Sequence, residues 1–144
     1  MKWKIFTIGK PKLSYARAGA EEYLERLGEA VEIISLKASH SEREALLMLE
    51  KSENAYRVAL DEKGEQISSA QLAQKIQQWE NQNIKTVALF IGGADGLSDM
   101  LKNECDWMWS LGKLTLQHEL ALVVALEQIY RAYAIQKNHP YHRE

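Results

Sequence analysis

The stretch Ile91-Gly92-Gly93-Ala94-Asp95-Gly96 joins an apolar run, residues 86–91, to a helical segment that begins at Ser98. An apolar run of this length, bounded by glycine, is typical of a buried strand. Three glycines within five residues let the backbone approach a ligand closely and expose N–H groups near a helix N-terminus. A tight strand-to-helix turn without a ligand explains the same glycines, so this loop alone leaves both interpretations open.

The same alternation of apolar runs and amphipathic stretches extends along the whole chain. β-Branched and aromatic content predicts strands at residues 3–8, 31–36, 57–60, 86–91 and 107–111. Helical spacing predicts helices at residues 14–27, 41–51, 68–81, 98–104 and 119–137. Strands that alternate with helices form a mostly parallel sheet with helices on both faces, because each crossover needs a dozen or more residues. The sequence therefore predicts one α/β domain over residues 1–144.

The composition excludes several classes of protein. With 46% hydrophobic and 26% charged residues, it is that of a folded globular domain and not of a disordered or coiled-coil chain. One cysteine, Cys105, excludes an internal disulfide, and the histidines form no zinc-binding pattern, so we expect a reducing cytoplasm and no metal. A net charge of −2 means that any nucleic-acid site must be local. The longest apolar run, residues 120–126, is far shorter than the roughly 20 residues that cross a bilayer.

The loops after Leu60, Ile91 and Leu111 form the candidate site, because ligands of parallel α/β sheets bind beyond the carboxyl ends of the strands. The glycine loop is no dinucleotide fingerprint, since Ile91 stands where the first glycine would fall. It is no Walker loop either, since Leu97-Ser98 replaces the lysine and hydroxyl residue. A nucleotide-binding protein that holds phosphate at Gly92-Gly93 remains an alternative, which the missing lysine disfavours.

Residues 112–119 alternate like a strand and lead directly into the most apolar helix of the chain. An extended loop held in the interior is typical of this pattern. His118 and Glu119 do not begin a zinc-protease helix, because Leu122 stands where the second histidine would be. For His118 a capping role is the alternative to a catalytic one.

The helix over residues 120–126 is apolar around its circumference, which is typical of a helix buried on all sides. Either a homodimer interface or a central position in a monomer core provides such cover. Glu127 and Arg131, four residues apart, predict a helical ion pair of about 0.2–0.5 kcal/mol.

The tail, residues 136–144, combines imidazole, phenol and guanidinium groups around Pro140. Chain ends are often frayed and inert. The same groups also stack on bases and bind phosphate. Lys10, Lys12 and Arg17 add a local basic cluster, which is either solvated surface or part of a groove for RNA.

Taken together, these motifs resemble the RlmH family of SPOUT-class methyltransferases. The residues that carry the resemblance are Leu-Asp at 60–61, Ile-Gly-Gly-Ala-Asp-Gly-Leu at 91–97, Trp-Ser-Leu at 109–111, Leu-Thr-Leu at 114–116, His118, Tyr-Arg-Ala at 130–132 and Asn-His-Pro-Tyr-His-Arg-Glu at 138–144. The likeness covers essentially the whole chain. Each motif alone is weak, but their order and spacing are specific.

The resemblance implies an S-adenosylmethionine-dependent enzyme that methylates N3 of a pseudouridine in a stem-loop of bacterial 23S rRNA, within the assembled ribosome. It also implies a trefoil-knotted SPOUT-type domain, in which the segment after Leu111 threads through a loop, and a cytoplasmic homodimer. By position, the cofactor contacts fall at Leu60, Gly92, Gly93, Gly112, Lys113, Leu114, Thr115, Leu116 and Gln117. The residues matched to the reaction or to RNA are His118, Tyr141 and Arg143, and His142 is a second candidate to accept the proton.

The chain departs from the pattern common in that family at three positions. Gln117 stands where relatives commonly carry proline, and Glu119 stands where they carry proline or glutamine. Leu122 stands where they carry arginine. Loss of a cation and gain of a carboxylate beside His118 make the site less suited to an anionic partner. This favours, as an alternative, a non-catalytic or altered-substrate protein that binds RNA or the ribosome with the same fold.

Overall fold

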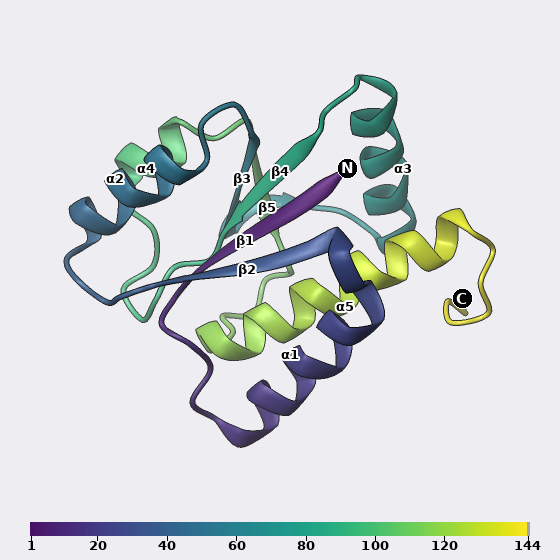
Figure 1. Cartoon of the computed structure of the whole chain (residues 1–144), viewed down its shortest axis with the longest axis horizontal. Helices are drawn as coiled ribbons and strands as arrows, with labels where there is room; N and C mark the ends of the chain where they lie inside the picture. The colour runs from purple at the N-terminus through teal and green to yellow at the C-terminus, as the bar shows by residue number, and fades with distance from the viewer. Residues whose placement is uncertain (144) are drawn as a thin grey trace.

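The computed structural model describes residues 1–143 and contains one sheet of five parallel strands (Figure 1). The strands are β1 (Lys2–Ile8), β2 (Val31–Leu36), β3 (Tyr56–Gln66), β4 (Thr86–Phe90) and β5 (Trp107–Ser110). The helices are α1 (Ser14–Leu27), α2 (Ser41–Lys51), α3 (Ser69–Asn81), α4 (Asp99–Asn103) and α5 (His118–Gln136), and a 3-10 turn, η1 (Gly28–Ala30), follows α1. The strand order is β2-β1-β4-β3-β5 with every pair parallel, which confirms the predicted α/β sheet.

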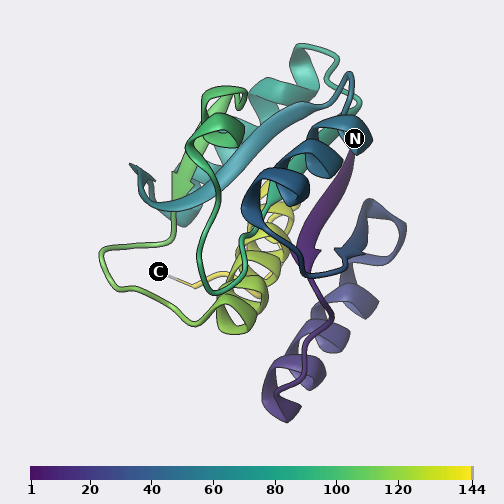
Figure 2. The same cartoon turned by 90° about the vertical axis from the view of Figure 1, so that its left-hand side faces the viewer.

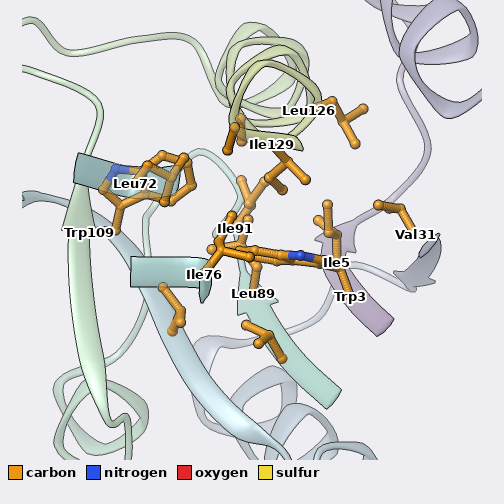
Figure 3. Packing of buried hydrophobic residues seen from close by; sticks show 14 of the residues in the cluster. Trp3, Ile5, Val31, Leu72, Ile76, Leu89, Ile91, Trp109, Leu126 and Ile129 are labelled. Atoms are coloured by element: carbon orange, nitrogen blue, oxygen red, sulfur yellow. The ribbon is translucent and has the colours of Figure 1, made fainter. Parts of the chain in front are cut away.

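Two apolar layers enclose the sheet because successive strand residues point to opposite faces. On β1, Trp3 and Ile5 belong to one core cluster and Phe6 to the other. Helices α1, α3 and α5 contribute to the first cluster, and α2 and α4 to the second, so helices cover both faces (Figures 1 and 2). Figure 3 shows Leu126 and Ile129 of α5 in the same cluster as Trp3 and Ile5. Burial from both sides explains why β4, the central strand of the sheet, is apolar from Val87 to Phe90.

Helix α5 is largely covered by its own chain. No residue from His118 to Gln136 is exposed, and Ala125, Leu126 and Ile129 are fully buried. The apolar circumference of α5 is therefore explained by a central position in the monomer and does not by itself require a partner. Arg131 Nε donates to Glu127 Oε1 at 2.8 Å, which confirms the predicted pair. Within residues 1–143, no helix combines the length and apolarity needed to cross a membrane.

Strand β3 is longer than predicted. It continues beyond Leu60 to Gln66, although residues 61–66 are mostly charged. Leu60 and Glu65 both pair with Trp109, so residues 61–64 bulge out of the ladder with β5. A Cβ on Gly64 would lie 2.7 Å from the backbone carbon and oxygen of Met108, so only glycine lets the bulge return this closely to β5. The prediction that the strand ends at Leu60 was wrong because the polar bulge breaks the apolar pattern.

Candidate functional site

A cavity of about 400 Å³ opens at the carboxyl edge of the sheet, beyond β4 and β5 and beside the bulge of β3. Its walls are formed by residues 60–63, 91–97, 111–112 and 114–116 and by Lys102, His118 and Ala121. The loops singled out by the sequence thus converge on one hollow, since the parallel strands bring their carboxyl ends to one edge. The volume lies within the roughly 300–1,000 Å³ that small-molecule sites occupy.

Most residues predicted to contact a cofactor lie around this cavity. Those that line it are Leu60, Gly92, Gly93, Gly112, Leu114, Thr115 and Leu116. Lys113 is exposed and is not among the lining residues. Gln117 is also outside the lining, and its Oε1 accepts hydrogen bonds from the N–H groups of Glu119 (2.8 Å) and Leu120 (3.1 Å). The structure therefore shows Gln117 as the N-cap of α5, and its contact with a cofactor stays a prediction.

The loop between β5 and α5 is more exposed than the sequence predicts. It forms the rim of the cavity and not an interior strap, and the Leu114 side chain is 79% exposed. Ser110 Oγ closes the start of the loop, because it donates to the Gly112 carbonyl (2.9 Å) and accepts from the Gly112 N–H (3.1 Å). Gly112 has φ 140°, in the region that favours glycine. The expectation of an interior segment was wrong because its apolar residues face a hollow.

The glycine turn after β4 has its own structural reasons. A Cβ on Gly92 would lie 2.6 Å from the carbonyl carbon of Gly96, and Gly96 has φ 74°. The Gly96 N–H donates to the Gly93 carbonyl at 3.0 Å and closes the turn. A Cβ on Gly93 would meet Ile8 only at an ordinary 3.5 Å. The tight turn therefore explains Gly92 and Gly96, whereas no packing contact requires glycine at position 93.

An ion pair in the cavity wall escaped the sequence analysis. Lys102 Nζ of α4 donates to Asp61 Oδ2 at 2.8 Å, and both side chains are largely buried. Burial alone would raise the pKa of Asp61, but the hydrogen bonds from Lys102 and from the Lys63 N–H outweigh burial and lower it. Asp61 directly follows the predicted strand at residues 57–60, which was a usable signal. No sequence pattern pointed to Lys102, because it lies on a different element, α4.

His118 lies at the first turn of α5, where it borders the cavity. Its Nδ1 is 3.4 Å from Gln117 Nε2, and its Nε2 is 3.9 Å from Glu119 Oε2. Glu119 Oε1 also accepts hydrogen bonds from the backbone N–H groups of Lys12 (2.7 Å) and Leu13 (2.9 Å). These bonds, that from Leu13 foremost, lower the pKa of Glu119.

The departures from the family pattern near His118 therefore have structural partners. The Glu119 carboxylate is held by the backbone ahead of α1 and is not a free anion at the site. Leu122 is only 2% exposed and packs in the core of the first face. Both residues contribute to folding, so neither by itself indicates the loss of a function.

The tail docks on α1 and α5 of its own chain. Tyr141 Oη lies 3.0 Å from Tyr23 Oη, and its ring meets the ring of Tyr130 edge-on at 4.7 Å. The guanidinium of Arg131 lies 4.8 Å from the centre of the Tyr141 ring and 3.2 Å from Nδ1 of His142. Burial and the bond to Tyr23 raise the pKa of Tyr141 to about 12. Tyr141 is therefore a neutral phenol at physiological pH.

The four residues predicted for the reaction are not brought together within one chain. Twelve residues separate His118 from Tyr130, which corresponds to about 18 Å along the helix axis. Figure 1 shows the tail at the far end of α5 from its first turn. Arg143 is exposed there, and Glu144, the last residue of the closing motif, lies outside the described residues. Among residues 1–143, no group of His, Cys, Asp and Glu side chains could hold a metal ion.

Comparisons with known proteins agree with this geometry. Residues 1–142 match the family model described as predicted SPOUT methyltransferase. The ribosomal RNA large subunit methyltransferase H of Methylobacillus flagellatus is 39% identical, and the alignment covers 100% of both chains. A probable methylase family protein from Haemophilus influenzae shares the fold with a TM-score of 0.65 at 13% identity, over 99% of this chain and 70% of that one. The SpoU methyltransferase AviRb from Streptomyces viridochromogenes, solved in complex with AdoMet, has a TM-score of 0.51 at 14% identity, over 94% of this chain and 60% of that one.

These matches bear on the class of protein. They favour a SPOUT methyltransferase over the alternative of a nucleotide-binding protein. The family match also identifies the five-stranded parallel sheet as a SPOUT fold, a class that implies the trefoil knot expected from the family resemblance. The chain therefore belongs to the SPOUT methyltransferase family, within the group of large-subunit ribosomal RNA methyltransferases H.

Proposed function

We propose that this protein transfers a methyl group from S-adenosylmethionine to N3 of a pseudouridine in 23S rRNA of the large ribosomal subunit. The observation that carries the proposal is the cavity where the bulge of β3 meets the loops after β4 and β5, which is lined by seven residues matched to the family's cofactor site. The Methylobacillus relative, a ribosomal RNA large subunit methyltransferase H, supports the RNA substrate, because it is 39% identical over its full length.

The residues around the cavity fit S-adenosylmethionine. Apolar side chains such as Leu60 and Leu116 suit the adenine ring and the thioether carbons, and the glycine backbone at Gly93 leaves room for close approach. Three carboxylates and two lysines line the cavity, so its wall carries a net negative charge; these residues are Asp61, Glu62, Asp95, Lys63 and Lys102. A net negative wall suits a cofactor whose ammonium and sulfonium groups outnumber its one carboxylate.

When bound, the cofactor supplies an already activated methyl electrophile, so the work of the protein is to align the attacking nitrogen and to manage its proton. The imide nitrogen attacks well only after it has lost its proton. If its pKa lies about two units above the working pH, that loss costs about 2.7 kcal/mol. A nearby base or cation reduces this cost.

His118 is the candidate base at the cavity, because its imidazole borders the hollow and is one-third exposed. His142 is the second candidate. Arg143 would stabilise negative charge on the carbonyl oxygens beside the nitrogen. Tyr141, with a pKa of about 12, is a phenol at neutral pH, so it can donate a hydrogen bond. It cannot serve as the base, because almost none of it is in the phenolate form that accepts a proton.

We propose that the active form is a cytoplasmic homodimer that acts on the assembled ribosome. In one chain the docked tail and His118 lie at opposite ends of α5. A second copy that places its tail beside the cavity would unite His118 with Tyr141, His142 and Arg143. It would also cover Leu114 at the cavity rim. Shape recognition of an assembled ribosome would suit a protein whose net charge is −2.

The deciding experiment is mass spectrometry of 23S rRNA from ribosomes of a strain that lacks this protein, before and after incubation with the protein and S-adenosylmethionine. We expect one added methyl group on one pseudouridine. His118→Ala and Arg143→Ala should slow the transfer, whereas His40→Asn, which keeps a capping side chain ahead of α2, should not. No methylation by the wild type would contradict the proposal.

The alternative of a non-catalytic RNA-binding protein is separated by calorimetry with S-adenosylmethionine. Binding at the cavity supports the enzyme. Association with ribosomes but no binding of the cofactor would instead support the binding protein, and ribosome sedimentation provides that second measurement.

A further inference from the structure

The bulge of β3, residues 61–64, connects two other walls of the cavity. Its neighbouring acids reach in different directions, as successive side chains of a strand do. Asp61 pairs with Lys102 of α4 at 2.8 Å, and Glu62 Oε2 accepts a hydrogen bond from Thr115 Oγ1 at 2.6 Å. The first contact fixes the bulge against the helix after the glycine loop. The second joins the bulge to the loop between β5 and α5.

The middle of that loop has few other attachments. Its start is closed by Ser110 and its end by Gln117, whereas Lys113, Leu114 and Thr115 are exposed. Among the hydrogen bonds of residues 1–143, only the Thr115–Glu62 bond ties residues 113–116 to another part of the protein. The conformation of the rim therefore depends strongly on this one bond.

The bond is well suited to hold a loop. A hydroxyl that donates to a carboxylate forms a short, charge-assisted hydrogen bond, which is roughly twice as strong as a neutral one. The backbone on either side of Glu62 is held in place, because Asp61 is paired and Gly64 lies close to the backbone of Met108 and Trp109. A hydrogen bond to a held segment restricts the conformations of the loop that donates it.

We propose that Glu62 is a positioning residue that holds residues 112–117 in the conformation that binds S-adenosylmethionine. This inference rests on the proposed function and adds a residue whose side chain acts through Thr115. A loop that this bond already holds loses less conformational freedom when a ligand binds.

Backbone order parameters from NMR relaxation test the structural half of the inference without the cofactor. The order parameters of residues 112–117 should be lower in Glu62→Ala and in Thr115→Val than in the wild type. Thr115→Ser keeps the hydroxyl and should restore much of the order. Glu50→Gln, an exposed acid near the end of α2 and outside the cavity lining, is the matched control and should change nothing. Unchanged order parameters in both Glu62→Ala and Thr115→Val would overturn the inference.

Calorimetric titration with S-adenosylmethionine tests the functional half. Glu62→Ala and Thr115→Val should each weaken binding roughly tenfold, and Thr115→Ser, which keeps the hydroxyl, should lose less affinity than Thr115→Val. The double variant Glu62→Ala/Thr115→Val should be no weaker than either single variant, because both changes remove the same bond. Thermal unfolding of each variant shows that weaker binding does not arise from loss of the fold.

The outcomes separate this inference from the proposed function. The role of Glu62 is refuted if the wild type binds but neither single variant loses affinity. It is also refuted if the affinity losses of Glu62→Ala and Thr115→Val add up in the double variant. The proposed function stands in both cases. If the wild type does not bind S-adenosylmethionine, the proposed function fails, and with it the ligand assigned to the loop. The order parameters then decide separately whether Glu62 orders residues 112–117.

Discussion

Gly19 of α1 lies directly against Val123 of α5, because a Cβ on Gly19 would stand only 2.9 Å from Val123 Cγ1. Glycine inside a helix costs roughly 0.5–1 kcal/mol relative to alanine. The close approach of the two helices explains why glycine is nevertheless found here. The contact matters for the site, since α5 begins with His118 at the cavity.

We predict that Gly19→Ala lowers the free energy of unfolding by about 1–2 kcal/mol, because overpacking outweighs the gain in helix propensity. Chemical denaturation of the purified protein measures this change. Adding Val123→Ala should make the loss smaller than the sum of the two single effects, since it removes the colliding methyl groups. A Gly19→Ala protein more stable than the wild type would contradict the packing seen between α1 and α5.

A second prediction concerns the glycines around the cavity. Gly64→Ala should destabilise the protein by roughly 1–3 kcal/mol, because its Cβ would meet backbone atoms of β5 at 2.7–2.8 Å. Gly93→Ala is the matched control and should change stability little, since its Cβ would meet Ile8 only at 3.5 Å. Thermal unfolding of both variants measures the difference. Equal stabilities would show that the bulge adapts and does not need glycine.

Glu119 predicts a dependence of stability on pH. Hydrogen bonds from the backbone of Leu13 and Lys12 lower its pKa in the folded state. The contribution of the Glu119 carboxylate to the free energy of unfolding is therefore present above the ordinary carboxyl pKa near 4.5. It is lost as the pH falls through the lowered pKa of the folded protein. Glu119→Ala should cost about 1 kcal/mol at pH 7, as the loss of a helix cap does. The difference in the free energy of unfolding between wild type and variant, measured by chemical denaturation, should become smaller as the pH falls below about 5. A gap that widens in acid would contradict this account.

The ion pair in the cavity wall predicts a measurable change in titration. Lys102→Met should raise the pKa of Asp61, because burial then acts without the strongest opposing hydrogen bond. Lys63→Met should have a smaller effect, since the backbone N–H of residue 63 still donates to Asp61 Oδ1. NMR titration of the Asp61 carboxyl carbon distinguishes the two variants. An identical change of the Asp61 pKa in both variants would show that the pairing with Lys102 is not specific.

Much of the fold could be predicted from local sequence. The expected helix of residues 119–137 and the observed α5 differ by one residue at each end. Strand β3 was predicted too short, because its last residues are polar and only their pairing with β5 makes them a strand. The loop at residues 112–117 was placed in the interior, because its alternation does not show that the inward side faces a cavity.

The sequence by itself determined the parallel α/β sheet, the three loops around the cavity and, through ordered motifs, the family. Hydrophobic periodicity, glycine positions and motif spacing are properties of neighbouring residues and can be recognised without coordinates. Only the tertiary structure decided that Asp61 meets Lys102, that Glu62 meets Thr115 and that Tyr141 docks on Tyr23. These partners are 41, 53 and 118 residues apart. Chain segments so distant become neighbours only through the strand order and the packing of helices on the sheet, which no local pattern encodes.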